Sequence, residues 1–213
     1  MYPGAHAKAR ANEPAIIMGL SGEIVTYETF EARANRLAHW LWRFGLRPLD
    51  HFAVFMENHP RFLECGAAGF RSGLYFTYVN CYLSAEELAY ILDNSESQVV
   101  FTSSSRLQTA LAAMKGAPRV RACVVVDGAG DGELVTNLDV ATADCPVTPL
   151  PDERTGVAML YSSGSTGQPK GILRPPPETP PGVATPLFQA FWHYWRLNEA
   201  DFVGGAAAIG SLR

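Results

Sequence analysis

Between residues 52 and 126 the chain alternates short apolar runs with segments of helical spacing, and this alternation constrains the fold more than any other feature. Repeated β-α units of this kind build a parallel sheet whose faces are covered by crossover helices. We therefore predict an α/β fold, with a mostly parallel sheet and flanking helices. The predicted strands are 52–56, 75–79, 98–102 and 122–126, and the predicted helices are 61–72, 84–93 and 106–114.

Two further elements are expected before this region. Residues 16–26 alternate loosely around Ser21-Gly22, which predicts a small hairpin. Apolar residues then recur at steps of three or four from Phe30 to Phe44, which predicts a helix that ends at Gly45. A serine followed by two glutamates at 84–87 predicts a capping box at the start of the helix over 84–93.

The region after residue 126 is predicted to be more irregular. Residues 127–154 contain several glycines and prolines and are interpreted as an irregular connection. A β segment resumes at Val157. Prolines between Pro175 and Pro186 exclude regular structure until an aromatic-rich helix at 187–195.

The strand that begins at Val157 leads into a stretch rich in glycine, serine and threonine, which ends in a lysine. Its glycines let the backbone approach a charged ligand, and successive N–H groups form anion-binding concavities. Hydroxyl groups add donors, and the lysine adds a mobile positive charge. Because ligands of open α/β sheets bind at the carboxyl ends of strands, we predict a nucleotide phosphate site here. The candidate residues are Ser162, Ser163, Gly164, Ser165, Thr166, Gly167, Gln168, Pro169 and Lys170.

Composition and spacing alone leave another interpretation of this stretch open. Serine- and glycine-rich segments between apolar runs are usually solvated turns or linkers. The stretch is also not a Walker A motif, since Pro169 precedes Lys170 and Gly171 follows it. A P-loop NTPase is disfavoured for the same reason.

The order of residues 161–171, Tyr-Ser-Ser-Gly-Ser-Thr-Gly-Gln-Pro-Lys-Gly, resembles the signature loop of the adenylate-forming superfamily. That superfamily includes acyl-CoA synthetases, luciferases and peptide-synthetase adenylation domains, and its pattern is close to Tyr-Thr-Ser-Gly-Thr/Ser-Thr-Gly-x-Pro-Lys-Gly. Residues 26–38, 56–61 and 79–93 are also similar to early segments of acyl-CoA synthetases. The likeness can be followed from about residue 12 to residue 202, and the stretch after Lys170 resembles the fatty-acyl or carnitine-type ligases most.

This resemblance implies a chemistry. ATP and a carboxylic acid, here expected to be a fatty acid, form an acyl-adenylate and pyrophosphate, and the thiol of CoA then attacks the adenylate. Residues 162–170 would hold the β- and γ-phosphates, with Mg²⁺ bridging phosphate oxygens and Lys170 neutralising the departing pyrophosphate. ATP, Mg²⁺, CoA and the acid are therefore the expected ligands. We identify no catalytic side chain and no protein metal ligand in the chain.

The chain departs from the family in its length. Family members continue past the loop into segments for adenine and ribose, a hinge, and a small C-terminal domain with a catalytic lysine. None of these is recognised in residues 1–213, and the register is lost near Phe202. We therefore expect residues 1–213 to be a truncated N-terminal adenylation domain without its C-terminal domain, incapable of acyl-CoA synthesis alone. The alternative is a non-catalytic remnant that binds nucleotide or pairs with another chain, with exposed sheet edges allowing self-association.

Composition bounds the remaining classes. A chain that is 47% hydrophobic and 18% charged is globular rather than disordered. A net charge of −4 argues against a nucleic-acid binder, which would carry a basic field. No apolar run approaches the roughly 20 residues of a transmembrane helix, and the first twelve residues lack a signal core. The scattered cysteines, Cys65, Cys81, Cys123 and Cys145, are expected to be reduced thiols in a cytoplasmic protein.

Overall fold

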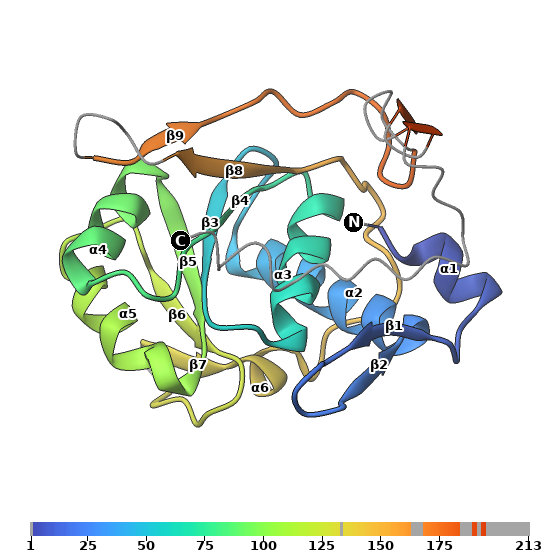
Figure 1. The fold of residues 1–213 in the computed structure, drawn as a ribbon, viewed down its shortest axis with the longest axis horizontal. Coiled ribbons are helices and arrows are strands. Elements are labelled where there is room, and N and C mark those ends of the chain that lie inside the picture. The colour runs from blue at the N-terminus through green and yellow to red at the C-terminus, as the bar shows by residue number, and fades with distance from the viewer. Residues whose placement is uncertain (1, 133, 163–167, 184–188, 191–192, 195–213) are drawn as a thin grey trace.

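A computed structural model describes residues 2–132, 134–162, 168–183, 189–190 and 193–194 of the 213-residue chain. Within these ranges the centre of the molecule is a seven-stranded sheet with the order β7-β6-β5-β3-β4-β8-β9 (Figure 1). All neighbouring strands are parallel except β8 and β9, which are antiparallel. The predicted α/β fold with a mostly parallel sheet is confirmed. The strands are β3 (His51–Phe55), β4 (Tyr75–Tyr78), β5 (Ser97–Thr102), β6 (Ala122–Val125), β7 (Val135–Asn137), β8 (Val157–Ser162) and β9 (Lys170–Ile172).

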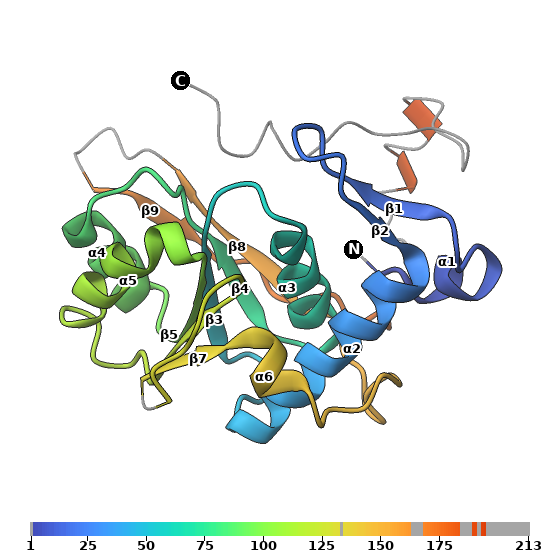
Figure 2. The same cartoon turned by 90° about the horizontal axis from the view of Figure 1, so that it is seen from below.

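Helices cover both faces of this sheet (Figure 2). One face carries α2 (Tyr27–Phe44), α3 (Pro60–Arg71) and α6 (Leu138–Thr142), and the other carries α4 (Ala85–Asn94) and α5 (Leu107–Met114), which the short 3₁₀ turn Ser104–Arg106 precedes. Strand β3 divides its side chains between the two layers: Phe52 and Val54 enter the first core, and Ala53 and Phe55 enter the second. Successive strand residues point to opposite faces, so a central strand buried on both sides is apolar throughout.

The N-terminal elements agree with their predictions. Strands β1 (Pro14–Ile17) and β2 (Ile24–Thr26) form the expected antiparallel hairpin. A short helix, α1 (Gly4–Ala9), precedes the hairpin in the sequence and was not predicted. Helix α2 begins after Thr26, whose hydroxyl accepts the Thr29 N–H, and it ends at Gly45 with a φ of 107°. Only glycine adopts this left-handed conformation readily, so the sequence position of Gly45 ends the helix.

The predicted capping box at α4 is present. The Ser84 hydroxyl accepts the Glu87 N–H at 3.3 Å, and the Glu87 carboxylate accepts the Ser84 N–H at 2.8 Å. These two bonds satisfy donors that a helix start leaves unpaired. Helix α4 therefore begins at a defined residue.

The prediction that residues 127–154 are irregular throughout is wrong. Strand β7 extends the sheet beside β6, and α6 follows it directly, with the Asn137 side chain accepting the Val140 N–H. Both elements are too short for a periodic pattern to identify them. Strand β9 was also not predicted, because three residues after a proline give no strand signal. The predicted helix at 187–195 lies mostly outside the described residues.

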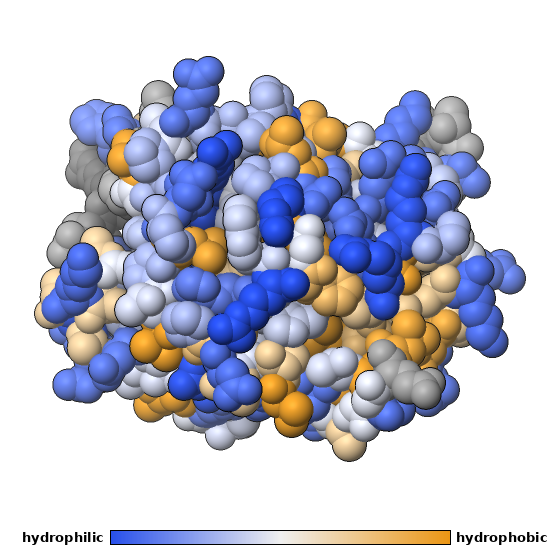
Figure 3. Space-filling view, turned by 180° about the vertical axis from the view of Figure 1, so that it is seen from behind, coloured by the Kyte–Doolittle hydropathy of each residue, from blue (hydrophilic) through white to orange (hydrophobic). Residues whose placement is uncertain are grey.

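The surface is mixed in character. Seen from behind, polar and charged side chains cover most of the face, and apolar side chains gather toward its lower right (Figure 3). Within the described part of the chain, none of the helices combines the length and apolarity needed to cross a membrane. The cysteines are unpaired, as predicted: Cys65, Cys81, Cys123 and Cys145.

Candidate phosphate-binding site

The predicted phosphate-binding stretch connects the end of β8 to the start of β9. Ser162 is the last residue of β8 and Lys170 the first of β9, and the two lie opposite each other in the antiparallel pair. The structure therefore brings Ser162 and Lys170 together, with Gln168 and Pro169 leading into β9. The other predicted residues, Ser163, Gly164, Ser165, Thr166 and Gly167, lie outside the described residues.

The position of this connection in the sheet agrees with the sequence-based expectation. Strand β8 runs parallel to β4, with Tyr75 opposite Val157 and Thr77 opposite Met159. The connection therefore leaves the same edge of the sheet as the carboxyl ends of β3 to β6. Ligands of open α/β sheets bind at this edge.

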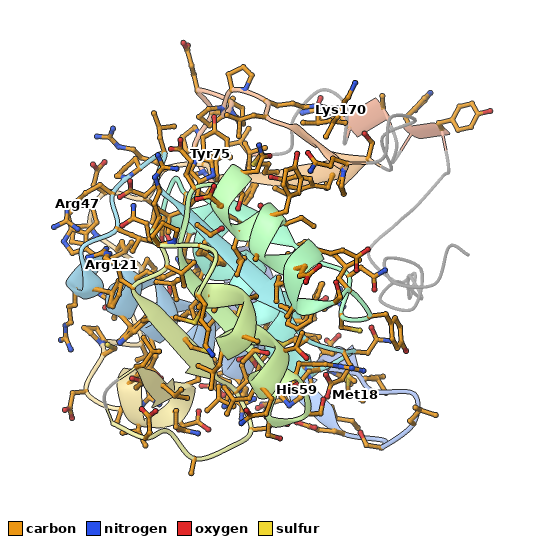
Figure 4. All side chains as sticks on the ribbon, turned by 90° about the vertical axis from the view of Figure 1, so that its left-hand side faces the viewer. Met18, Arg47, His59, Tyr75, Arg121 and Lys170 are labelled. Carbon is orange, nitrogen blue, oxygen red and sulfur yellow. The ribbon has the colours of Figure 1, made fainter. Side chains whose placement is uncertain are left out.

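The charge of Lys170 is available to a ligand. Its side chain is exposed, and none of the ion pairs among the described residues includes it. Lys170 lies on β9 at the upper margin of the molecule, well separated from His59 (Figure 4). An ammonium group without an internal carboxylate partner favours an external anion.

Gly171 leaves room for two side chains of β8. A Cβ atom at this position would come within 2.4 Å of the Met159 Cε atom and 3.2 Å of the Tyr161 phenol oxygen. A larger residue would occupy the space of the Met159 and Tyr161 side chains, which would then have to move. Gly171 thus lets both side chains lie over β9, next to Lys170.

Two tyrosine hydroxyls join this connection to helix α4, and sequence reasoning did not identify them. The Tyr90 phenol donates a hydrogen bond to the Pro169 carbonyl oxygen at 3.0 Å. The Tyr161 phenol donates to the Asn94 side-chain oxygen at 2.7 Å. The partners are 79 and 67 residues apart in sequence, so no local pattern could have identified either pair.

A second polar group lies at the carboxyl edge of the sheet, after β3 and β5. The Glu57 carboxylate accepts hydrogen bonds from the Ser103 and Ser105 hydroxyls at 2.6 and 2.8 Å. Partial burial raises the pKa of Glu57, but these hydrogen bonds and nearby Arg106 outweigh it, so the net pKa is lowered. Because the Ser103 and Ser105 hydroxyls already donate to Glu57, they are less available than Lys170 to bind an anion.

The donor set of the candidate site fits phosphate groups. It consists of hydroxyls, backbone N–H groups and one ammonium, which are the groups that bind phosphate oxygens. Among the described residues, no cluster of three or more His, Cys, Asp or Glu side chains could hold a metal ion.

Comparison with known proteins gives the site its context. The model of the family described as AMP-binding enzyme matches residues 4–176, which contain all of the sheet and the whole connection from β8 to β9.

Two curated relatives show the extent of the likeness. The chain is 29% identical over 164 residues to a 3-oxocholest-4-en-26-oate–CoA ligase of Rhodococcus rhodochrous, covering 74% of this chain and 30% of the relative. It is 30% identical over 168 residues to the fatty acid–[acyl-carrier-protein] ligase ScoC of Streptomyces coeruleorubidus, covering 79% and 31%. The chain thus spans about a third of the length of these relatives.

Solved structures share the fold. A Rhodopseudomonas palustris protein assigned as a long-chain-fatty-acid CoA ligase superposes with a TM-score of 0.76 at 24% identity, covering 93% of this chain and 48% of that one. A likeness at this identity extends to the fold of the backbone.

Proposed function

The chain belongs to the AMP-binding enzyme family, and we propose that its protein uses ATP to activate a carboxylic acid as an acyl-adenylate, which a thiol then converts to a thioester. In the first step a carboxylate oxygen attacks the α-phosphorus of ATP, and pyrophosphate leaves. In the second step the thiol sulfur attacks the acyl carbon, and AMP leaves. We further propose that residues 1–213 act as the N-terminal portion of an adenylation domain.

Residues 162–170 bind the β- and γ-phosphates in this proposal. The hydroxyls of Ser163, Ser165 and Thr166 donate hydrogen bonds to phosphate oxygens. Lys170 neutralises the charge that builds on the departing pyrophosphate, which lowers the barrier by electrostatic stabilisation. Magnesium, when bound, supplies positive charge shared between the phosphate oxygens. Little proton transfer is needed, because the carboxylate is already ionised.

One observation carries this proposal: Lys170 and Ser162 face each other across the β8–β9 pair at the carboxyl edge of the sheet, and Lys170 is exposed without an ion-pair partner among the described residues. A cation and a hydroxyl at the two ends of one short connection suit an anionic ligand between them.

The proposal for the acid and the thiol rests on the names of the relatives and on the sequence after Lys170. The names of the relatives include a steroid acid and fatty acids, and both CoA and acyl carrier protein as acceptors. We propose a fatty acid and CoA, because the stretch after Lys170 resembles fatty-acyl ligases. Pyrophosphate release with ATP, Mg²⁺, CoA and a panel of acids tests the activity of the isolated 213 residues, from which we expect no turnover. Robust turnover would contradict that expectation.

Binding of Mg-ATP tests the site itself. Isothermal titration of the wild type against Lys170→Ala should give a dissociation constant raised about tenfold or more, because charge-assisted hydrogen bonds contribute about 1.5–3 kcal/mol. Lys115→Ala is the matched control, since Lys115 is also exposed but lies after α5. Equal affinities of wild type and Lys170→Ala would refute the site.

A second function, pairing with another chain, has one observation in its favour. All three residues of β9 are exposed, and β9 is an edge strand of the sheet that the described residues form. An edge strand presents unpaired backbone N–H and C=O groups. Sedimentation over a range of concentrations tests this, and a monomer at every concentration would exclude self-association.

A further inference from the structure

We propose that Tyr90 and Tyr161 are positioning residues, which hold the start of β9 and the end of β8 against helix α4 and so set where Lys170 stands relative to a bound phosphate group. This inference rests on the proposed function, since it assigns a role within the same site. Neither residue belongs to the phosphate-binding stretch 162–170.

The two hydrogen bonds lie on either side of the connection between the strands. Tyr161 precedes it and donates to Asn94 at 2.7 Å, and Pro169, its last residue, accepts from Tyr90 at 3.0 Å. Tyr161 is next to Ser162, and Pro169 is next to Lys170. Each bond therefore holds a residue next to a predicted phosphate contact, through its side chain at Tyr161 and through its backbone carbonyl at Pro169.

Both bonds reach the same face of one helix. Tyr90 and Asn94 are four residues apart in α4, the spacing at which side chains lie over one another. The rings of Tyr90 and Tyr161 both pack against the core on that side of the sheet. Both ends of the connection are therefore hydrogen-bonded to the same part of helix α4, which lies beside β8 and β9 (Figure 1).

Helix α4 can position the connection because its own structure is well stabilised. Its first turn has the Ser84–Glu87 capping box, and its inner face is buried through Leu88, Ile91 and Leu92. By contrast, β9 has three exposed residues and pairs only with β8 among the described strands. The contacts to α4 supply order that the short edge strand lacks.

The Tyr161 phenol remains a donor across the physiological range. Burial raises its pKa to about 12, with a further rise from the nearby Tyr90 and a smaller opposite effect from Ser95. The hydroxyl is therefore protonated at neutral pH, and the bond to Asn94 does not depend on a titration near pH 7.

Loss of either bond should weaken ligand binding because Lys170 becomes less ordered, although neither tyrosine contacts the ligand in this proposal. A lysine on a loosened edge strand samples more positions, and binding must then fix it. The net contribution of one hydrogen bond corresponds to about three- to tenfold in an equilibrium constant.

The chain offers a matched control. The Tyr75 phenol also donates to a backbone carbonyl of the segment after β9, that of Arg174, at 3.1 Å. Tyr75→Phe thus removes the same group and the same kind of bond, but four residues beyond Lys170. The test compares Tyr90→Phe, Tyr161→Phe and Tyr75→Phe in the full chain, by isothermal titration with Mg-ATP and by amide hydrogen exchange at Lys170 and Gly171.

We expect the dissociation constant to rise about three- to tenfold in Tyr90→Phe and in Tyr161→Phe, and to stay within about twofold of wild type in Tyr75→Phe. Exchange at Lys170 and Gly171 should be faster in the first two variants only. Equal weakening by Tyr75→Phe, or wild-type affinity in both other variants, overturns the inference. If Lys170→Ala binds Mg-ATP like wild type, the proposed function fails, and hydrogen exchange alone decides: faster exchange in the two variants supports positioning, and unchanged exchange rejects it.

Discussion

Gly156 lies so close to Leu74 that a Cβ atom on Gly156 would stand 2.4 Å from the Leu74 carbonyl oxygen, and 2.3 Å from that of Gly69. Both neighbours are backbone atoms, which cannot rotate away as a side chain can. The Gly156 N–H also donates to the Phe70 carbonyl oxygen at 2.7 Å. The backbone just before β8 is thus packed so closely against other backbone atoms that only glycine fits at position 156.

Gly156→Ala should therefore destabilise the protein by about 3 kcal/mol, the upper part of the usual range for overpacking. Urea unfolding at equilibrium measures this change. Gly19→Ala is the control, because a Cβ atom at Gly19 would meet nothing within 4 Å, and we expect a change below about 0.5 kcal/mol. Similar values for the two variants would show that the close passage at Gly156 has no energetic consequence.

Arg71→Ala should destabilise the protein by about 3–5 kcal/mol, the usual cost of leaving a buried partner unpaired. Arg71 is fully buried, and its guanidinium donates to both carboxylate oxygens of Glu31. A carboxylate oxygen of Glu153 lies 3.7 Å from its Nε atom, and the guanidinium lies over the ring of Tyr2. Its loss leaves two carboxylates, both mostly buried, without their cation.

The control for Arg71 is Arg154→Ala. Arg154 pairs with Asp152 at 2.9 Å, but both side chains are more than half exposed. Exposed pairs contribute about 0–1 kcal/mol. Urea unfolding of the two variants side by side should separate them clearly, and equal losses would mean that burial of the Arg71 pair adds nothing.

The contribution of Glu57 to stability should disappear in acid. Its pKa is lowered in the folded protein, because the hydrogen bonds from Ser103 and Ser105 outweigh the effect of burial. Folding is therefore favoured by the ionised form. This contribution is fully present above the unfolded-state pKa of about 4.3, and it is lost as the pH falls through the lower, folded-state value.

Unfolding free energies of wild type and Glu57→Gln, measured from pH 7 to pH 3, check this expectation. Their difference should be constant down to about pH 5 and should shrink below about pH 4. The double variant Ser103→Ala/Ser105→Ala keeps the carboxyl group without its hydroxyl donors, and its pH dependence should be weaker than that of wild type. A difference between wild type and Glu57→Gln that stays constant to pH 3 would contradict the lowered pKa.

Ser84→Ala should destabilise the protein by about 1 kcal/mol, because the capping box at the start of α4 loses the acceptor for the Glu87 N–H. Thermal or urea unfolding measures the change. Ser104→Ala serves for comparison: Ser104 is exposed, and it takes part in its local contact with Asp127 through its backbone N–H. No loss in Ser84→Ala would mean that the helix start is held by other contacts.

Much of the fold was predictable because its signals are local. The four central strands are mostly apolar, since a strand covered on both faces has few polar positions. The end of α2 at Gly45 and the start of α4 at Ser84 were predictable because single residues determine those backbone conformations. The place of the candidate site followed too, since a strand leads directly into the connection.

The elements that were missed form only beside a neighbour. Strand β7 has three residues and exists because β6 offers an open edge, and β9 exists because β8 does. Helix α6 has five residues, too few for a periodic pattern. Short segments of this kind take their structure from pairing rather than from their own propensities.

The amino-acid sequence by itself determined the α/β class, the order of the central elements and the nine-residue stretch from Ser162 to Lys170 that stays our predicted phosphate site. It did so because apolar period, caps and glycines act over a few residues. Tertiary structure alone decided that Ser162 faces Lys170 and that Tyr90 reaches Pro169. These contacts join residues distant in the chain, and they form only once the strands have paired and α4 has packed against the sheet.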